Sequence, residues 1–215
     1  QGKEALNAAS AHVTPSTISD ILFTSGTTGQ AKGVVTDHGQ NLQAFSAFVD
    51  ILGLEPTDNY LIINPFFHSF GYKAGWLATM IAGATAFPQS IFDVPTVSEQ
   101  IERHGINVMP GPPTLFQSLL DHEDFDREKL KTLSKATTGA AVIPTQLIED
   151  MWQKLGIDTV ITAYGLSETC GLVTMCRQGD DAETIATTSG RSIPGIEVAI
   201  FDDQGNALPA MEPGE

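Results

Sequence analysis

Short apolar runs alternate with longer amphipathic stretches along most of the chain. The apolar runs predict β-strands over Ile18–Phe23, Gly33–Thr36, Tyr60–Asn64, Thr85–Phe87, Asn107–Met109, Ala136–Gly139 and Thr159–Tyr164. The amphipathic stretches predict helices over Gly39–Leu52, Tyr72–Ala82, Val94–His104, Pro113–Leu120 and Thr145–Leu155. Pro113 and Pro144 stand where two of these helices would begin, a place that suits a residue without a backbone N–H. The alternation predicts an α/β fold, with a mostly parallel sheet and helices on both of its faces.

The same pattern divides the chain into three parts. Residues 1–17 are small and polar and indicate a linker-like tail, whereas the alternating elements occupy residues 18–176. From residue 177 onward Gly, Asp, Thr and Pro accumulate, and Ile196–Phe201 alternates like a strand that ends in the turn sequence DDQGN. We therefore expect residues 177–215 to be the start of a small β-rich subdomain. Because the sequence stops in a Pro/Gly turn soon afterwards, we expect the chain to be a piece of a longer polypeptide.

Charge and composition argue against several classes of function. The 215 residues include 11 Lys and Arg but 26 Asp and Glu, and the resulting net charge of −15 disfavours nucleic acid and anionic membranes as partners. The sequence has no stretch of about 20 apolar residues, so no transmembrane segment is predicted. The two cysteines, Cys170 and Cys176, match no metal or redox spacing, and the histidines form no pair spaced four apart. Two reduced thiols and no secretory leader predict a cytoplasmic protein.

One loop between two predicted strands has a composition typical of a phosphate site. Residues 23–35 read FTSGTTGQAKGVV, with four hydroxyl side chains, three glycines and one lysine. This is not a Walker A loop, because Gly26 and Gly29 are only three residues apart and Lys32 is followed by Gly33. Glycines still let backbone N–H groups approach an anion, the hydroxyls donate further bonds, and Lys32 supplies a charge. An ordinary β-turn is the alternative, although it needs only one or two Gly or Asn residues.

A second motif, TAYGLSETCG, occupies residues 162–171 at the end of the predicted strand Thr159–Tyr164. In an open α/β sheet, ligands bind at the carboxyl ends of the strands. Tyr164 offers a flat face for a purine, Ser167 offers a hydroxyl, and Glu168 offers the hard oxygen that Mg²⁺ prefers. The alternative is a core tyrosine followed by a serine and an acidic residue that begin a helix.

Two further stretches also stand at strand ends. NPFFHSFGY, residues 64–72, combines aromatic side chains with His68, which fits an apolar tunnel with a polar gate. Core packing around a hydrogen-bonded histidine is the alternative. TTGAAVIP, residues 137–144, places small residues before a predicted helix, where backbone could lie flat against a ligand.

Taken in this order and spacing, the four motifs resemble those of the adenylate-forming superfamily, which includes acyl- and aryl-CoA synthetases, luciferase and the adenylation domains of peptide synthetases. The resemblance runs from about Ile18 to the end of the chain. Ala31 stands where the family usually has proline, which should loosen the loop slightly, and Ser167 replaces the usual threonine but keeps the hydroxyl. The family's later motifs and an N-terminal portion are absent. The resemblance therefore implies the central piece of a ligase, and we expect these residues alone not to turn over.

The resemblance implies a role for each motif. By it, the phosphates of ATP would be bound by Thr24, Ser25, Gly26, Thr27, Thr28, Gly29, Lys32 and Ser167. The adenine would lie against Gly139, Ala140, Ala141, Tyr164 and Gly165. The acyl pocket would be lined by Phe67, His68, Phe70 and Gly71, with His68 as its gate. Glu168 would bind Mg²⁺, and the catalytic residues would be Lys32, His68 and Glu168.

The implied activity is that of an ATP-dependent carboxylic acid–CoA ligase, which forms an acyl-AMP, releases pyrophosphate and then transfers the acyl group to coenzyme A. Amino-acid-activating relatives carry an aspartate near the acyl-pocket motif, but residues 66–70 read FFHSF, and this favours a plain carboxylic acid. PFFHSFGYK is similar to the CoA ligases of actinobacterial fatty-acid and sterol breakdown, including one type that acts on a steroid-ring propanoate. Lys73 in this stretch is a candidate partner for a distal polar group, but a snorkelling surface lysine is the favoured interpretation.

Other functions are weighed against this one. An adenylation domain that loads an amino acid or aryl acid onto a carrier protein would share the phosphate loop. A non-catalytic nucleotide-binding module would share it too, but would not need Glu168. Another ATP-using enzyme, such as a kinase, would need a Walker A or kinase signature, and the sequence has neither.

Overall fold

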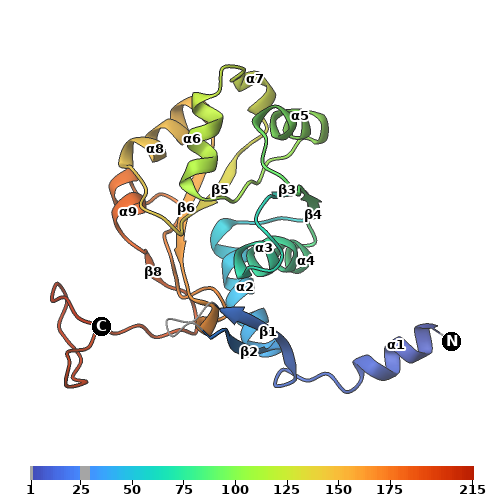
Figure 1. Ribbon diagram of the computed structural model, residues 1–215, viewed down its shortest axis with the longest axis vertical. Coiled ribbons are helices and arrows are strands. Elements are labelled where there is room, and N and C mark those ends of the chain that lie inside the picture. The colour runs from blue at the N-terminus through green and yellow to red at the C-terminus, as the bar shows by residue number, and fades with distance from the viewer. Residues whose placement is uncertain (1, 25–29) are drawn as a thin grey trace.

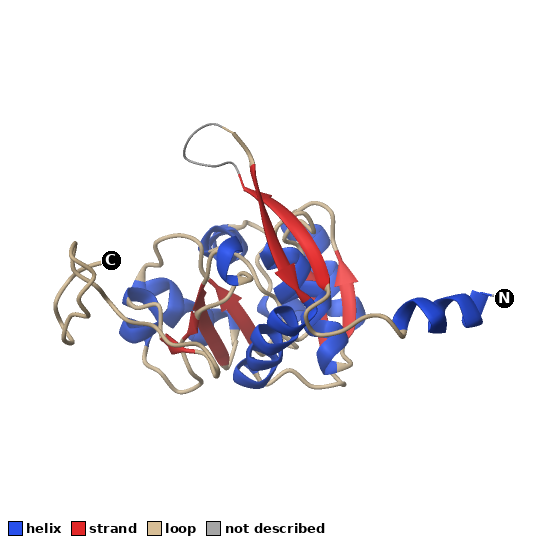
Figure 2. Ribbon diagram, turned by 90° about the horizontal axis from the view of Figure 1, so that it is seen from below, coloured by secondary structure: helices blue, strands red, loops and turns tan. Residues whose placement is uncertain are grey.

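The computed structural model describes residues 2–24 and 30–215. Its first two strands, β1 (Ile18–Thr24) and β2 (Lys32–Asp37), pair antiparallel as the hairpin that the sequence predicts. Figure 2 shows this hairpin as a long ribbon that projects beyond the helices and the other strands. One face of the hairpin packs on α2 (His38–Leu52), which follows β2 directly. The hairpin therefore carries the predicted phosphate loop at its free end.

The remaining strands form a small mixed sheet, in which the parallel pairing that the sequence predicts is joined by antiparallel strands at one side. Its strands are β3 (Asn59–Ile62), β4 (Thr85–Pro88), β5 (Lys135–Thr138), β6 (Thr159–Tyr164), β7 (Thr174–Met175) and β8 (Arg191–Ser192). The pairs β3–β4 and β5–β6 are parallel, whereas β7 runs antiparallel to both β6 and β8. The chain reverses immediately after β6, and the Val173 N–H donates to the Tyr164 carbonyl at 2.8 Å. This reversal makes β7 antiparallel.

The predicted strand Asn107–Met109 is reduced to one bridge position. Val108 pairs in parallel with Tyr60 on one side and Lys135 on the other, and so joins β3 to β5. Pro110 follows at once, and proline cannot donate to a ladder. The α/β class is confirmed, with the spatial order β4, β3, Val108, β5, β6, β7, β8.

The predicted helices are present, and two of them change their winding midway. The segment after β3 runs through α3 (Ser69–Gly71), a π-helical turn η1 (Tyr72–Leu77) and α4 (Ala78–Ala82). A second π-helical turn, η2 (Met151–Leu155), ends α8 (Thr145–Asp150). The other helices are α5 (Val94–His104), α6 (Pro113–Asp121), α7 (Arg127–Leu130) and α9 (Ala182–Thr187). Single π turns inside helices occur frequently at functional sites.

The helices gather in two groups beside the sheet (Figure 1). α2, η1 and α4 contact one another, and η1 contacts β3. α6, η2 and α8 form a second group, in which η2 contacts β6, and α9 contacts both β6 and α8. None of the helices within residues 2–24 and 30–215 combines the length and apolar character that a membrane span requires.

The two ends of the chain differ from the prediction. Residues 2–10 form a helix, α1 (Gly2–Ser10), that the sequence pattern does not indicate, and none of its residues is buried. The predicted strand Ile196–Phe201 is wrong, because the segment is irregular and only Phe201 makes a bridge, to Ala207. Val198 stays 51% exposed and Ile200 42%, so neither of these apolar side chains is buried against a sheet.

Tyr60 of β3 ties the sheet to the segment after it. The side chain is fully buried, and its hydroxyl donates to the carbonyl oxygen of Ala74 in η1 at 2.5 Å. Burial raises the pKa of the phenol. The hydroxyl therefore stays a donor, and it satisfies a carbonyl in the π-helical turn.

Tyr60→Phe should destabilise the protein, because it leaves the buried Ala74 carbonyl without this donor. A buried unsatisfied acceptor costs about 1–3 kcal/mol. For a chain of this size that corresponds to a fall in Tm of very roughly 2–12 °C, which thermal unfolding followed by circular dichroism would measure. Tyr164→Phe is the matched control, since Tyr164 is 46% exposed and the same atom is removed. Equal Tm values for Tyr60→Phe and the control would contradict the role given to the hydroxyl.

Candidate functional site

The predicted phosphate loop is held at its base by the last pair of the hairpin. Thr24 on β1 pairs with Lys32 on β2, and the Lys32 side chain is exposed. The other predicted phosphate-binding residues of this loop, Ser25, Gly26, Thr27, Thr28 and Gly29, lie outside the described residues. An exposed ammonium beside the hydroxyl of Thr24 is suited to an anion.

The second motif forms a tight turn next to the hairpin. Ser167–Thr169 is a 3₁₀ turn, η3, which contacts β2. The Thr169 hydroxyl accepts from the Leu166 N–H at 3.0 Å, and the Gly171 N–H donates to the Leu166 carbonyl at 2.7 Å. A side chain at Gly165 would collide with the backbone of Gly171, so this turn requires a glycine there. Lys32 and Glu168 thus belong to neighbouring elements, as the phosphate and metal predictions require.

Glu168 itself is exposed and is a single carboxylate. The described residues contain no cluster of three or more His, Cys, Asp or Glu side chains that could hold a metal ion. Mg²⁺ is often bound by one or two carboxylates together with substrate phosphates and water. The chemistry of this donor therefore fits Mg²⁺ that arrives with a nucleotide, and it does not fit a metal held by protein alone.

One wall of the site is formed by Gly139, Ala140, Ala163 and Tyr164, at the carboxyl ends of the parallel strands β5 and β6. In the β5–β6 register Thr138 pairs with Thr162, so Gly139 and Ala140 leave the sheet beside Ala163 and Tyr164. A Cβ atom on Gly139 would lie 2.9 Å from the Ala163 carbonyl oxygen, so the two chains approach closely only because this residue is glycine. Ala140 has a φ of 63°, a left-handed conformation that costs of order 1 kcal/mol or more in a residue with a side chain and is enriched at functional sites.

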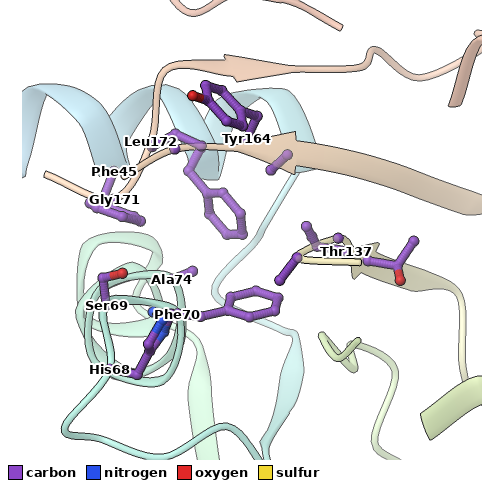
Figure 3. A pocket seen from close by; sticks show the side chains of 15 residues that line it. Phe45, His68, Ser69, Phe70, Ala74, Thr137, Tyr164, Gly171 and Leu172 are labelled. Carbon is purple, nitrogen blue, oxygen red and sulfur yellow. Dashed lines mark hydrogen bonds between the residues drawn. The ribbon is translucent and has the colours of Figure 1, made fainter. Parts of the chain in front are cut away.

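A cavity of about 120 Å³ opens on one side of this wall (Figure 3). Its lining is mostly apolar: Phe45, Phe48, His68, Ser69, Phe70, Ala74, Thr137, Thr138, Gly139, Ala140, Ala163, Tyr164, Gly165, Gly171 and Leu172. In Figure 3, Ser69, Phe70 and Ala74 stand on one side, Tyr164 and Leu172 on another, and Thr137 on a third. No Asp, Glu, Lys or Arg is among these lining residues.

His68 caps the helix at the edge of this cavity. Its Nδ1 accepts from the Phe70 N–H at 3.1 Å, so in the neutral ring the proton is on Nε2. The side chain is exposed, and His68 and Phe70 both line the cavity. The structure does not bring Phe67 into it, since that side chain is 83% exposed, and Gly71 instead packs against the Asn64 and Pro65 carbonyls.

A second, wider cavity of about 360 Å³ lies across the same wall. It shares Gly139, Ala140, Ala163 and Tyr164 with the first cavity, and its further lining is Ala141, Ile143, Thr162, Ala186, Thr187, Thr188 and Ser189. Four of the five predicted adenine residues, Gly139, Ala140, Ala141 and Tyr164, therefore lie together here. Gly165, the fifth, lines only the first cavity.

Sequence reasoning missed several lining residues and misplaced one lysine. Phe45 and Phe48 are three apart on α2, and this helical spacing could have indicated one apolar face.

The prediction that Lys73 is a snorkelling surface lysine is wrong. Its side chain is fully buried and its Nζ lies 3.3 Å from Asp20 Oδ1, because η1 packs beneath the hairpin. Cys170 and Cys176 are buried free thiols, and burial raises the pKa of each.

Curated relatives with high similarity are bacterial CoA ligases. The chain is 50% identical over 202 residues to the "3-[(3aS,4S,7aS)-7a-methyl-1,5-dioxo-octahydro-1H-inden-4-yl]propanoyl:CoA ligase" of Rhodococcus jostii, covering 94% of this chain and 39% of that enzyme. It is 52% identical over 203 residues to the ligase of the same name from Mycobacterium tuberculosis, covering 93% of this chain and again 39% of the relative. The chain thus spans about 39% of the length of these relatives.

Solved structures and a family model agree with this likeness. ATP-bound MatB from Rhodopseudomonas palustris superposes with a TM-score of 0.83 at 24% identity, over 97% of this chain and 42% of that one, which shows the shared fold. The inhibitor-bound N-terminal domain of FACL13 from Mycobacterium tuberculosis gives 0.77 at 27% identity, over 87% and 46%. The model of the AMP-binding enzyme family matches residues 2–215. The chain therefore belongs to the AMP-binding enzyme family.

Proposed function

We propose that the chain is the ATP- and acyl-binding part of an AMP-forming acyl-CoA ligase. The observation that supports this most is the pair of cavities that share the wall of Gly139, Ala140, Ala163 and Tyr164. One cavity is lined without a carboxylate or ammonium, and the other contains most of the predicted adenine residues. A carboxylate and a nucleotide placed across one wall could meet at its edge, where the turn η3 begins.

The charges near that edge suit the first half-reaction. A carboxylate oxygen attacks the α-phosphorus of ATP, the new C–O–P linkage forms, and the bond to the bridging oxygen breaks so that pyrophosphate leaves with its electron pair. Two anions must approach each other, so neutralisation and alignment supply most of the rate. Lys32 and Thr24 would hold the β- and γ-phosphates together with Ser25, Gly26, Thr27, Thr28 and Gly29, and Ser167 would bind the α-phosphate.

Glu168 would hold Mg²⁺, which supplies charge neutralisation to the phosphates when bound. The Nε2–H of His68 would stand at the mouth of the acyl cavity, where it can donate to the substrate carboxylate. In the second half-reaction the thiolate of coenzyme A attacks the acyl carbon, the acyl–oxygen bond breaks, and AMP leaves.

The substrate would be a plain carboxylic acid with an apolar body. A substrate ammonium in the first cavity would meet no carboxylate, and leaving a charge buried without a partner costs several kcal/mol. The two bacterial relatives are named for a propanoate that carries a methyl-dioxo-octahydro-indenyl group. We propose a bicyclic propanoate of this class as the substrate, together with ATP and coenzyme A.

Pyrophosphate exchange into ATP, measured on this sequence extended to the length of its relatives, tests the proposal. A bicyclic propanoate should support exchange, whereas an amino acid should not, with fatty and aromatic acids in parallel. Lys32→Ala should lower kcat/KM by about 100-fold or more, as loss of a preorganised charge does. Lys129→Ala, which removes the same charge from α7, is the control and should change nothing. Exchange with an amino acid alone would favour a carrier-loading domain, and no exchange despite Mg·ATP binding would favour a non-catalytic module.

Filling the first cavity should impair the acid and spare the nucleotide. Ala74 lines this cavity and is 4% exposed, so Ala74→Leu would place three more carbons in the space proposed for the acyl group. A change of even one methylene in an apolar pocket alters kcat/KM by about 10- to 200-fold. We expect a loss in that range for the acid with the KM for ATP unchanged. Ala86→Leu on the exposed edge of β4 is the control for the added bulk, and an unchanged kcat/KM for the acid in Ala74→Leu would refute the assignment of this cavity.

A further inference from the structure

A buried ammonium joins the segment that lines the first cavity to the hairpin. Lys73 lies in η1 and its side chain has no exposed surface. Its Nζ is 3.3 Å from Asp20 Oδ1 on β1 and donates to the Thr36 hydroxyl on β2 at 3.1 Å. One side chain therefore bonds both strands of the hairpin, on the side that faces the helices.

Asp20 also accepts hydrogen bonds from two further side chains. The amide of Asn41 on α2 donates to Asp20 Oδ2 at 2.7 Å and to the Thr36 hydroxyl at 3.2 Å. The hydroxyl of Tyr72, also in η1, donates to Asp20 Oδ2 at 3.4 Å. We call this set of side chains the hairpin anchor: Asp20, Thr36, Asn41, Tyr72 and Lys73. This set links β1, β2, α2 and η1.

Because these charged groups are largely buried, the hairpin anchor is stable only when Asp20 and Lys73 keep their paired geometry. Burial alone raises the pKa of Asp20, yet the Lys73 charge and the bonds from Asn41 and Thr36 outweigh it, so the pKa lies below its ordinary value. Charges out of water are stable only in the geometry that pairs them. The hairpin anchor therefore fixes where the strands stand relative to η1 and does not merely add contact area.

The hairpin anchor lies close in sequence or in space to the hairpin end, the acyl cavity and the turn η3. Asp20 and Thr36 stand four residues from the Thr24–Lys32 pair, one on each strand. Lys73 directly precedes Ala74, which lines the acyl cavity. Next to Asn41, Gln40 Oε1 is 4.0 Å from the Sγ of Cys170, the residue that follows η3.

We propose that the Lys73–Asp20 pair positions the phosphate-loop hairpin against the segment that lines the acyl cavity, so that the carboxylate and the α-phosphate meet in line. This rests on the ligase function proposed above. Lys73 touches no reactant in this account and is a positioning residue. Its loss should lower the rate of adenylation more than the binding of either substrate.

A second buried pair provides a matched control. Lys135 Nζ lies 2.8 Å from Asp58 Oδ2 and 2.6 Å from the Gly53 carbonyl oxygen, with the two side chains 19% and 3% exposed. Asp58 precedes β3, and Lys135 begins β5. The cavities lie at the carboxyl ends of β5 and β6, whereas this pair lies at the amino ends of the strands. It should therefore contribute to stability alone.

The test compares Asp20→Asn/Lys73→Met with Asp58→Asn/Lys135→Met in the ligase of full length. Both double variants remove a buried charge pair while keeping side-chain size. Pyrophosphate exchange gives kcat and the KM for each substrate, and circular dichroism gives Tm. Misplacement of reactants by about 1 Å can cost 100-fold, so we expect the first variant to lose 10- to 100-fold in kcat with each KM within about 3-fold. The second should keep kcat within about 2-fold at a temperature where it is folded.

A milder variant covers the case in which the first double variant does not fold. Thr36→Val removes the acceptor of the Lys73 bond without changing the shape of the side chain. A fall in kcat of about 3-fold or more, measured at a temperature where the variant is folded, would support the proposal. Wild-type kcat in a folded Asp20→Asn/Lys73→Met enzyme, or in Thr36→Val, would overturn it. Absence of exchange in the wild-type enzyme with every acid would instead overturn the ligase function.

Discussion

The parallel pairing of β5 with β6 is the constraint on which the rest of the site depends. Because the strands run together in register, both leave the sheet at the same edge, and Gly139 and Ala140 meet Ala163 and Tyr164 there. The close approach requires glycine at 139, and the turn after β6 requires glycine at 165. Apart from Tyr164, the wall between the two cavities thus consists of backbone and small side chains, so two ligands could lie close together across it.

Besides the two cavities, the proposed site depends on the hairpin, which the hairpin anchor holds in place. The β1–β2 ribbon extends past the sheet and the helices that pack on it (Figure 2), so pairing between its own two strands does not fix its place relative to them. Lys73 and Asp20 supply that reference from within the core, at the cost of burying two charges. In a chain of net charge −15, the exposed ammonium of Lys32 would supply the local positive charge that an anionic ligand needs, whereas the charge of Lys73 is paired with Asp20.

Much of this arrangement can be predicted from sequence, where it depends on local signals. The strand Thr159–Tyr164 and the helix Val94–His104 were predicted to the residue, since periodicity and caps are local. The environment of Lys73 is not local, because its burial depends on Asp20 and Thr36, which are distant in sequence. The same applies to Ile196–Phe201, which pairs with no strand among the described residues, and to Phe45 and Phe48, whose place at the cavity depends on how α2 packs.

A crystal structure of the ligase of full length with a non-hydrolysable acyl-adenylate would test the central claim most directly, namely that one wall separates the acyl and adenine sites. The analogue should join a bicyclic propanoyl group to adenosine through a sulfamate. We predict the acyl group among Phe45, Phe70 and Leu172, and the adenine across Gly139 and Ala140 against Tyr164. An acyl group located in the cavity beside Thr187 and Ser189, or an adenine among the phenylalanines, would contradict the account.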